Sequence, residues 1–396
     1  MSEREGAQRE PEFRRTRLTW LTYAQLAVFG YFLYGFGPSV PLQRDDLHLS
    51  NAVGGLHGTA LATGSTLAGL TFALLSHRVG RTGTLRVGLL GLATGTLLYC
   101  LVPALPVTLA GALVCGLFGS YVVTGSVVVL SAAHGPAGPA AFSEANAAAA
   151  GAGLVAPLLL GAGAAIGIGW QPGLLIAAVA AVVVWVVSRR ESHQPTPARA
   201  AAAGPDLPGR LPAAYWLAWV VTLLCIGVEF CMTFWAADEL RERAGASPAA
   251  ATAGITAIVG GMFAGRLLGG RLALRIRPGR LLLAAVAVTL VGFAAFWSSS
   301  APVPAVAGLV VVGLGIALQY PLGTVRAVAA SGGRPDRAAG RLSIAAGLAS
   351  GVAPFALGAL ADSTGAHAAF LLVPALLLAA AAGVLVSGDL RGRPQV

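Results

Sequence analysis

The chain has 396 residues, of which 56% are hydrophobic and only 11% are charged, and its mean hydropathy is +0.76. Soluble domains carry roughly 25% charged residues, so the composition excludes an ordinary soluble domain and predicts an integral membrane protein. The formal net charge of +10 raises the question of nucleic-acid binding. The arginines lie in short loops between apolar segments, however, and we therefore expect no nucleic-acid partner.

Twelve apolar segments are long enough to cross a bilayer, whose hydrocarbon core of roughly 30 Å needs about 20 residues. We expect helices, because backbone groups in lipid need internal hydrogen bonds and no alternating strand pattern occurs. In chain order, the expected spans are residues 18–42, 51–75, 84–103, 106–131, 142–166, 170–188, 213–236, 248–274, 280–298, 303–326, 342–361 and 366–388.

The arginines predict the topology. All 26 basic residues are Arg, and all but Arg44, Arg241, Arg243 and Arg266 fall in the tails or in alternate loops. The positive-inside rule then places both termini in the cytoplasm, which requires an even number of spans. The absence of Lys, together with the high Ala, Gly and Pro content, indicates a high-GC bacterial gene. We therefore expect a multi-pass protein of the bacterial cytoplasmic membrane.

A polar, Pro-rich stretch at residues 189–212 divides the chain and is typical of a linker. The expected organisation is a cytoplasmic tail (1–17), a six-helix bundle (18–188), the cytoplasmic linker, a second six-helix bundle (213–388) and a short tail (389–396).

The two halves also share short sequences at nearly one offset, which indicates an internal repeat. The matching stretches are Arg78-x-Gly80-Arg81 with Arg277-x-Gly279-Arg280, Ala156-Pro157 to Gly161 with Ala353-Pro354 to Gly358, and Val114-Cys115-Gly116 with Val311-Val312-Gly313.

With these features, the whole chain resembles the major facilitator superfamily of secondary transporters. The loop after the second span resembles the family's basic loop signature, with His77 at the usual acidic position, and residues 265–275 resemble its second copy. Gly153 to Gly161 resembles the signature of proton-antiporting exporters, whereas Gln319-Tyr320-Pro321 resembles fucose-permease-like members. The resemblance implies an all-α fold of two pseudo-symmetric six-helix bundles that rock about a central site.

Glu229 is the clearest functional candidate, because an ionisable residue at bilayer depth costs about 2.5–3.5 kcal/mol on insertion scales. It lies about 16 residues into the seventh span, which is roughly 24 Å from the cytoplasmic surface. Glu229 is expected to carry a coupled proton and to contact substrate. The alternative is a carboxyl group that is hydrogen-bonded for structural reasons.

Arg266 is the one basic residue well inside a span, roughly 13 Å from the same surface. On these depths we expect no direct Glu229–Arg266 pair. Arg266 would instead bind an anionic group of the substrate or act as a gate residue near the cytoplasmic side.

Glu144 opens the fifth span, and Arg341 occupies its repeat-equivalent place. In the family, helices 5 and 8 meet across the halves, so Glu144 is expected to pair with Arg271 or Arg275 when the cytoplasmic side closes. The alternative is a carboxylate that favours a helix N-terminus. The loop arginines Arg78 and Arg81 complete the gate candidates.

The remaining candidates for substrate binding are uncharged at neutral pH. The family resemblance implies that helices 1, 4, 7 and 10 line the central site, and packing roles are the alternative for each of these side chains. The candidates are Tyr31, Tyr34, His57, Tyr121, Gln319 and Tyr320.

The expected function is secondary transport of a small neutral, weakly polar or cationic molecule, by proton-coupled efflux. The alternatives are proton-linked uptake of a sugar or similar nutrient and, less favoured, a non-transporting membrane sensor. No phosphate loop, metal cluster or catalytic constellation occurs in the sequence, so we expect neither an enzyme nor a cofactor. The expected partners are the solute, protons and the lipid bilayer, and we expect a monomer.

Overall fold

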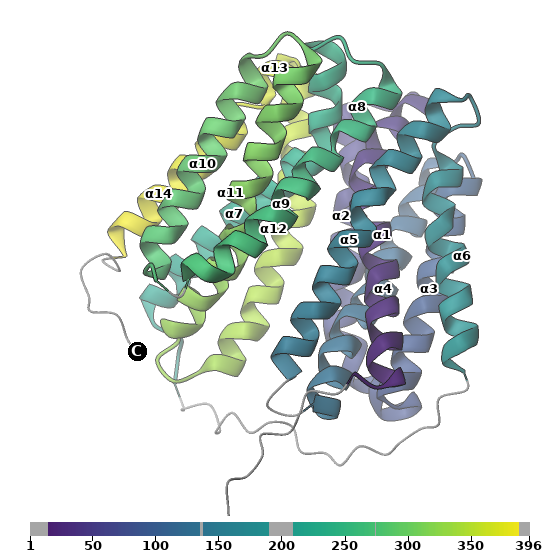
Figure 1. Ribbon diagram of the computed structural model, residues 1–396, viewed down its shortest axis with the longest axis vertical. Coiled ribbons are helices and arrows are strands. Elements are labelled where there is room, and N and C mark those ends of the chain that lie inside the picture. Colours follow the sequence, from purple (N-terminus) through teal and green to yellow (C-terminus); the bar gives the residue numbers. More distant parts are fainter. Residues whose placement is uncertain (1–14, 135–137, 190–208, 274, 388–396) are drawn as a thin grey trace, which may run out of the picture.

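The computed structural model describes residues 15–134, 138–189, 209–273 and 275–387. These residues form fourteen helices and no strand (Figure 1). The helices are α1 (Arg17–Asp46), α2 (Asn51–Val79), α3 (Arg81–Leu101), α4 (Leu105–His134), α5 (Gly138–Ala165), α6 (Gln171–Ser188), α7 (Ala213–Glu242), α8 (Pro248–Gly254), α9 (Thr256–Ala273), α10 (Pro278–Ser298), α11 (Pro302–Ala329), α12 (Pro335–Thr364), α13 (Ala366–Ala369) and α14 (Leu372–Val386).

These helices account for the twelve expected spans, because α8 with α9 and α13 with α14 each make one interrupted span. Ten spans are long and apolar enough to cross a membrane, and α1 and α2, with 30 and 29 residues, run beside them (Figure 1). Helices α1–α6 form one bundle and α7–α14 the other, which we call the N-half and the C-half. The predicted all-α, two-bundle membrane fold is confirmed.

Helix starts follow local sequence signals. Thr16 caps α1, where its side chain accepts from the backbone N–H of Thr19, and Ser50 caps α2 in the same way. Helices α8, α10, α11 and α12 carry Pro in the first turn. Backbone N–H groups in the first turn have no partner within the helix, so Pro, which lacks an N–H, costs no hydrogen bond there.

The two ends of the molecule differ. Helix α1 begins, α6 ends and α7 begins at the same end, shown at the bottom in Figure 1, which we call the tail end. Helix α1 ends and α2 begins at the opposite end, which we call the far end. The expected tails 1–17 and 389–396 and the linker 189–212 lie mostly outside the described residues.

Contacts between the halves gather toward the far end. Helix α2 packs on α12, where the Thr59 hydroxyl donates to the Gly351 carbonyl at 2.8 Å, and α5 packs on α8. Toward the tail end α9 and α12 diverge from α5 (Figure 1). The two halves therefore contact each other mainly in the part of the molecule nearer the far end. A site that is open between the halves must lie on the tail-end side of these contacts.

Candidate functional site

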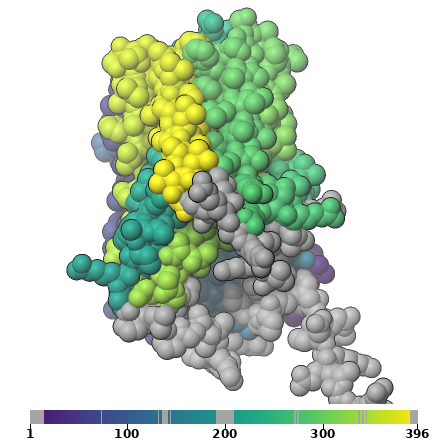
Figure 2. Space-filling view, turned by 90° about the vertical axis from the view of Figure 1, so that its left-hand side faces the viewer, coloured from purple at the N-terminus to yellow at the C-terminus, as the bar shows by residue number. Residues whose placement is uncertain are grey.

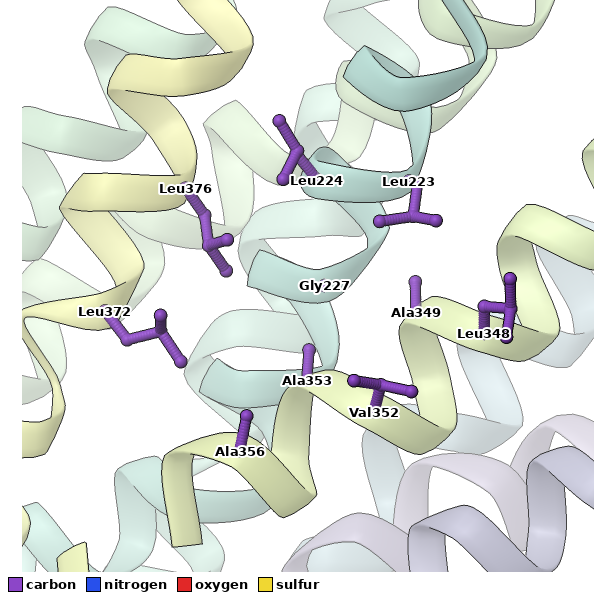
Figure 3. A pocket seen from close by; sticks show the side chains of 10 residues that line it. All are labelled: Leu223, Leu224, Gly227, Leu348, Ala349, Val352, Ala353, Ala356, Leu372 and Leu376. Carbon is purple, nitrogen blue, oxygen red and sulfur yellow. The ribbon is translucent and has the colours of Figure 1, made fainter. Parts of the chain in front are cut away.

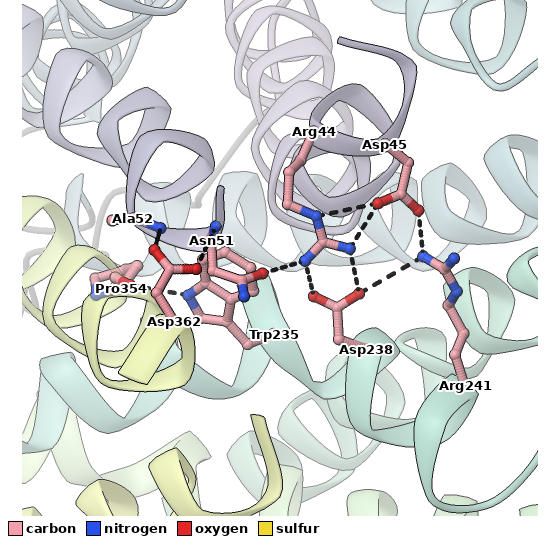
Figure 4. Close-up of polar contacts among 9 residues, drawn as sticks. All are labelled: Arg44, Asp45, Asn51, Ala52, Trp235, Asp238, Arg241, Pro354 and Asp362. Atoms are coloured by element: carbon pink, nitrogen blue, oxygen red, sulfur yellow. Dashed lines mark hydrogen bonds and ion pairs between the residues drawn. The ribbon is translucent and has the colours of Figure 1, made fainter. Parts of the chain in front are cut away.

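Four charged residues join the two halves at the far end (Figure 4). The Arg44 guanidinium donates to both carboxylate oxygens of Asp238, at 2.7 and 3.0 Å, and Arg241 donates to Asp45 at 2.6 Å. Arg44 and Asp238 are mostly buried, with side-chain exposures of 12% and 4%. We call these four residues the far-end latch.

A second contact beside the latch uses a helix end. Both oxygens of Asp362 in α12 accept backbone N–H groups at the start of α2, those of Asn51 and Ala52, at 2.8 Å each (Figure 4). The first N–H groups of a helix have no partner within the helix, and the N-terminus favours negative charge. Asp362 thus caps a helix of the other half.

Two further contacts mark how far the closed layer reaches toward the tail end. Gly37 of α1 packs against the Thr233 carbonyl of α7, and a Cβ on this glycine would lie 3.1 Å from that oxygen. On the other side, the Thr256 hydroxyl donates to the Leu154 carbonyl at 3.4 Å. Tyr34 and Glu229 lie about one helical turn beyond these contacts, on the tail-end side.

Three of the expected site residues meet at this level. The Arg266 guanidinium of α9 lies close enough to the Tyr34 hydroxyl of α1 and the Glu229 carboxylate of α7 to interact electrostatically with both. Arg266 is exposed and Glu229 is half-buried. We call Tyr34, Glu229 and Arg266 the central cluster; it joins the N-half to the C-half.

Glu229 and Arg266 form no direct hydrogen bond or salt bridge among the described residues, as expected from their depths, but they lie close enough to interact electrostatically. Helix α9 ends above the lower end of α12 in Figure 1, so the two helices do not end at one level. Side chains also tilt toward the N-terminus of their own helix. Helix α7 starts at the tail end and α9 starts toward the far end, so Glu229 and Arg266 lean toward one another.

A glycine of the helix 5 motif makes room for Tyr34. A Cβ built on Gly153 would lie 2.2 Å from Cδ2 of the Tyr34 ring, which is closer than any real contact. The ring therefore packs directly on the α5 backbone. Within the N-half, Gly153 determines the position from which the Tyr34 hydroxyl reaches Arg266.

The other candidates for substrate binding lie elsewhere. The Tyr31 hydroxyl donates to the Gly173 carbonyl at 2.5 Å, inside the N-half. His57 is fully buried between the Gly54 carbonyl and the Thr108 hydroxyl, at 3.0 and 2.9 Å.

Tyr121 is buried and shares a hydrogen bond of 2.6 Å with the Thr71 hydroxyl. Gln319 is 1% exposed, and its amide donates to Thr289 at 2.7 Å within the C-half. Tyr320 is 45% exposed on α11. The structure brings none of these five residues to the central cluster within the described part of the chain.

Glu144, the expected gate carboxylate, binds within its own half. It accepts from Arg15 at 2.6 and 2.9 Å and from the Tyr23 hydroxyl at 2.9 Å. Arg275 is exposed, and the side chain of Arg271 lies outside the described residues.

The remaining gate candidates are also at the tail end. Arg78 and Arg341 are exposed, and Arg81 is half-buried at the start of α3. The Arg341 carbonyl accepts from the Trp219 indole at 2.8 Å.

Sequence reasoning missed the latch. Arg44 and Arg241 stood out only as exceptions to the topology rule, although each has an acidic residue nearby, Asp45 and Asp238. The two Arg/Asp sets lie at the far ends of α1 and α7, which are equivalent helices of the repeat. This combination of opposite charges at repeat-related helix ends was the available signal.

The arrangement supplies donors and acceptors but little net charge. Glu229 offers acceptor oxygens, Arg266 offers a planar set of donors, and Tyr34 offers a hydroxyl that does both. Metal-binding clusters of three or more His, Cys, Asp or Glu are not found in the described residues. The central cluster can hydrogen-bond a small polar molecule and can exchange a proton at the carboxylate.

Comparison with solved structures identifies the fold. A bacterial homologue of the human lysosomal transporter Spinster, in an inward-facing and unoccupied conformation, aligns over 96% of this chain and 94% of its own, with 15% identity and a TM-score of 0.70. A D-xylose–proton symporter aligns over 95% and 97%, with 13% identity and a TM-score of 0.72. The nucleoside transporter NupG aligns over 93% and 98%, with 11% identity and a TM-score of 0.75.

No curated protein sequence matches this one. The family model of the Major Facilitator Superfamily matches residues 22–268, which is more than half of the chain. With two six-helix bundles that contact each other near one end and a polar cluster between them, this chain belongs to the Major Facilitator Superfamily.

Proposed function

We propose that this protein is a proton-coupled secondary transporter of a small, neutral, polar molecule, and that it works by alternating access. The observation that carries the proposal is the central cluster, where a carboxylate, a guanidinium and a phenol from α7, α9 and α1 meet between the halves. An ionisable group at membrane depth is expensive, so three polar groups gathered there favour a functional site over a packing role.

The charges of the cluster support coupling to protons. When Glu229 is ionised, its charge is balanced by Arg266, and when it is protonated, Arg266 and Tyr34 lose that interaction. A bound solute would use the same donors and acceptors. Proton and solute therefore compete for one set of groups, which favours exchange of one for the other.

The same charges narrow the expected substrate class. The positive charge of Arg266 cancels the negative potential of Glu229 that would attract a cationic ligand. Among the neutral, weakly polar and cationic substrates expected from the sequence, we therefore favour a neutral polar molecule. Sugar phosphates are disfavoured, because recognition of several negative charges usually uses several Arg or Lys side chains.

The arginine distribution supports a cytoplasmic tail end. The far-end latch would then hold the extracellular side closed, and the site would open to the cytoplasm. The likeness to a solved structure described as inward-facing and unoccupied agrees with this interpretation.

Export in exchange for protons is the direction that the helix 5 motif favours. Proton-linked uptake is the second candidate, and the fold likeness to a D-xylose–proton symporter favours it. The two directions are distinguished by which way a labelled solute moves when a pH gradient of known sign is imposed on oriented vesicles.

The test uses purified protein in liposomes with an imposed pH gradient and a panel of labelled monosaccharides, nucleosides and uncharged drugs. Glu229→Gln should abolish gradient-driven movement but retain exchange of labelled for unlabelled solute at equal pH. Glu242→Gln, at the exposed end of the same helix, is the matched control and should retain both activities. Full gradient-driven movement in Glu229→Gln would contradict the proposal.

A further inference from the structure

An apolar pocket of about 340 Å³ lies between three helices of the C-half (Figure 3). Its lining residues are Leu223, Leu224 and Gly227 of α7, Leu348, Ala349, Val352, Ala353 and Ala356 of α12, and Leu372 and Leu376 of α14. We call it the side pocket. It shares no residue with the central cluster or the far-end latch.

Small residues create the depth of the pocket. Gly227 faces Ala353, and a Cβ on this glycine would lie 3.2 Å from the Ala353 Cβ. Ala349 and Ala356 occupy the neighbouring turns of α12, so three of the five lining residues on this helix contribute only a methyl group, whereas α14 contributes leucines (Figure 3). Close packing would ordinarily fill such a space with larger side chains.

The pocket opens toward lipid rather than toward the central cluster. On α12, the inner face is marked by Gly351, which contacts α2, and by Pro354, whose carbonyl accepts from the Trp235 indole of α7 at 2.9 Å. Around the helix, Leu348 lies about 60° from Gly351 and about 120° from Pro354, and Val352 lies about 100° and about 160° from them. They are 46% and 56% exposed, although both are large and apolar.

The space-filling view from this side shows the same surface, where α14 runs down the face of the C-half and α7 emerges below it (Figure 2). Since the helices span a membrane, exposed leucine and valine here face hydrocarbon. The mouth of the side pocket is therefore continuous with the lipid-facing surface.

The chemistry of the lining selects the occupant. All ten lining residues are aliphatic or glycine, so the pocket offers no side-chain hydrogen bond to water, to a sugar or to a polar headgroup. Apolar cavities of about 150 Å³ stay dry and admit benzene-sized ligands, and this pocket is roughly twice that size. Because the pocket opens onto the hydrocarbon core of the bilayer, the molecules that can enter it are the lipids of that core.

We propose that the side pocket binds an acyl chain of a membrane phospholipid. Bound hydrocarbon restores contacts that the small residues leave unmade, and it supports α7 against α12 and α14. Every lining residue belongs to the C-half, so movement of one half against the other leaves the pocket intact. The lipid would therefore stay bound to the C-half in every conformation of the transport cycle. It stabilises α7, the helix that carries Glu229 two residues beyond Gly227.

The test uses the full-length protein in bilayers that contain phosphatidylethanolamine with a photoreactive diazirine midway along one acyl chain. After illumination, mass spectrometry of peptides locates the labelled residues. We expect severalfold more label on Leu348, Val352 and Leu376 than on Val288 and Val291, which are exposed on the lipid-facing side of α10.

Filling the pocket provides the decisive comparison. Ala349→Leu combined with Ala356→Leu should reduce labelling on α12 and α14 to the level found on α10. The variant should also lose the rise in the thermal unfolding midpoint that added phosphatidylethanolamine gives the parent protein in detergent. Ala287→Leu, an exposed position on α10, is the matched control and should change neither result.

Three outcomes would overturn the proposal. One is equal labelling of the side pocket and the α10 face, and another is pocket labelling that the filled variant retains. The third is cross-linking of two protein chains through cysteines introduced at Leu348 and Leu376, which would assign the pocket to a second copy. If the filled variant does not fold, displacement of the photoreactive lipid by unlabelled phosphatidylethanolamine in the parent protein supports the proposal, and undiminished labelling contradicts it.

Discussion

Arg44 at the end of α1 holds Asp238 of α7 through two hydrogen bonds, of 2.7 and 3.0 Å, that cross between the halves. Each member of the latch also has an oppositely charged partner in its own half, since Asp45 lies 2.7 Å from Arg44 and Asp238 lies 3.6 Å from Arg241. Separation of the halves would therefore leave each half with a neutral Arg/Asp pair. The latch favours closure without leaving a lone buried charge when it opens.

Replacement of Asp238 should weaken closure of the far end. Breaking a buried ion pair costs roughly 3–5 kcal/mol, and because Arg44 retains Asp45, we expect about 2–3 kcal/mol for Asp238→Asn. Spin labels at His48 and Arg243, both exposed at the far end, would report the change as a new population with a longer distance. An unchanged distance distribution would contradict the assigned role.

Replacement of Asp45 should have a smaller effect. Asp45 and Arg241 are 38% and 27% exposed, so solvent screens their pair, and exposed pairs contribute about 0.2–1 kcal/mol. Asp45→Asn should therefore shift the same distance distribution much less than Asp238→Asn. Equal shifts would mean that the latch acts as one unit and not through its buried pair.

Gly153→Ala should displace the Tyr34 ring. The added Cβ would lie 2.2 Å from the ring, and overpacking of this kind costs about 1–3 kcal/mol. The thermal unfolding midpoint and solute transport should both fall. Tyr34→Ala in the same chain should recover the midpoint but not transport, and a double-mutant cycle measures this coupling. Additive losses would show that the two positions do not interact.

Arg266 should matter for its shape as well as its charge. Arg266→Gln removes a charged donor whose hydrogen bonds contribute about 1.5–3 kcal/mol, so transport should fall at least about tenfold. Arg266→Lys keeps the charge but not the planar set of donors, and it should give an intermediate rate. The rate is measured as exchange of labelled solute in liposomes. If Arg266→Lys is as slow as Arg266→Gln, the positive charge at this position does not contribute to transport.

Glu144 should change partners as the tail end closes. In the structure it binds Arg15 and Tyr23, whereas the family resemblance implies a partner on the helix 8 side. We expect Glu144→Cys and Arg275→Cys to form a disulfide faster when Asp238→Asn is also present, because opening of the far end favours closure of the tail end. A rate that does not respond to Asp238→Asn would exclude this exchange.

Much of the fold could be predicted from the sequence, because each span had to supply about 20 apolar residues by itself. The expected seventh span, residues 213–236, lies within α7, and the expected third span, residues 84–103, differs from α3 by only a few residues. The break in the eighth span at Ile255 was not expected, since the residues around it are as apolar as those on either side. Tertiary contacts with α5 and α7 accompany that break.

The candidate site was predicted in part. Glu229 and Arg266 stood out because charge within an apolar run is costly wherever it occurs, and that cost can be read from one segment alone. Whether they interact depends on the heights of α7 and α9 along the bundle axis and on the direction in which each helix runs. These heights are determined by the packing of whole helices. Tyr34 could not be separated from Tyr31 in the sequence, because only packing decides which of two nearby rings faces the other half.

The sequence by itself determined the membrane environment, the number of spans, the repeat and the few buried charges, since each follows from local hydropathy and charge. Only the tertiary structure decided which charges meet, that Arg44 and Asp238 close one end, and that Glu144 binds Arg15. These pairings join residues more than a hundred positions apart. Their partners are selected by the packing of the two bundles, which no single segment encodes.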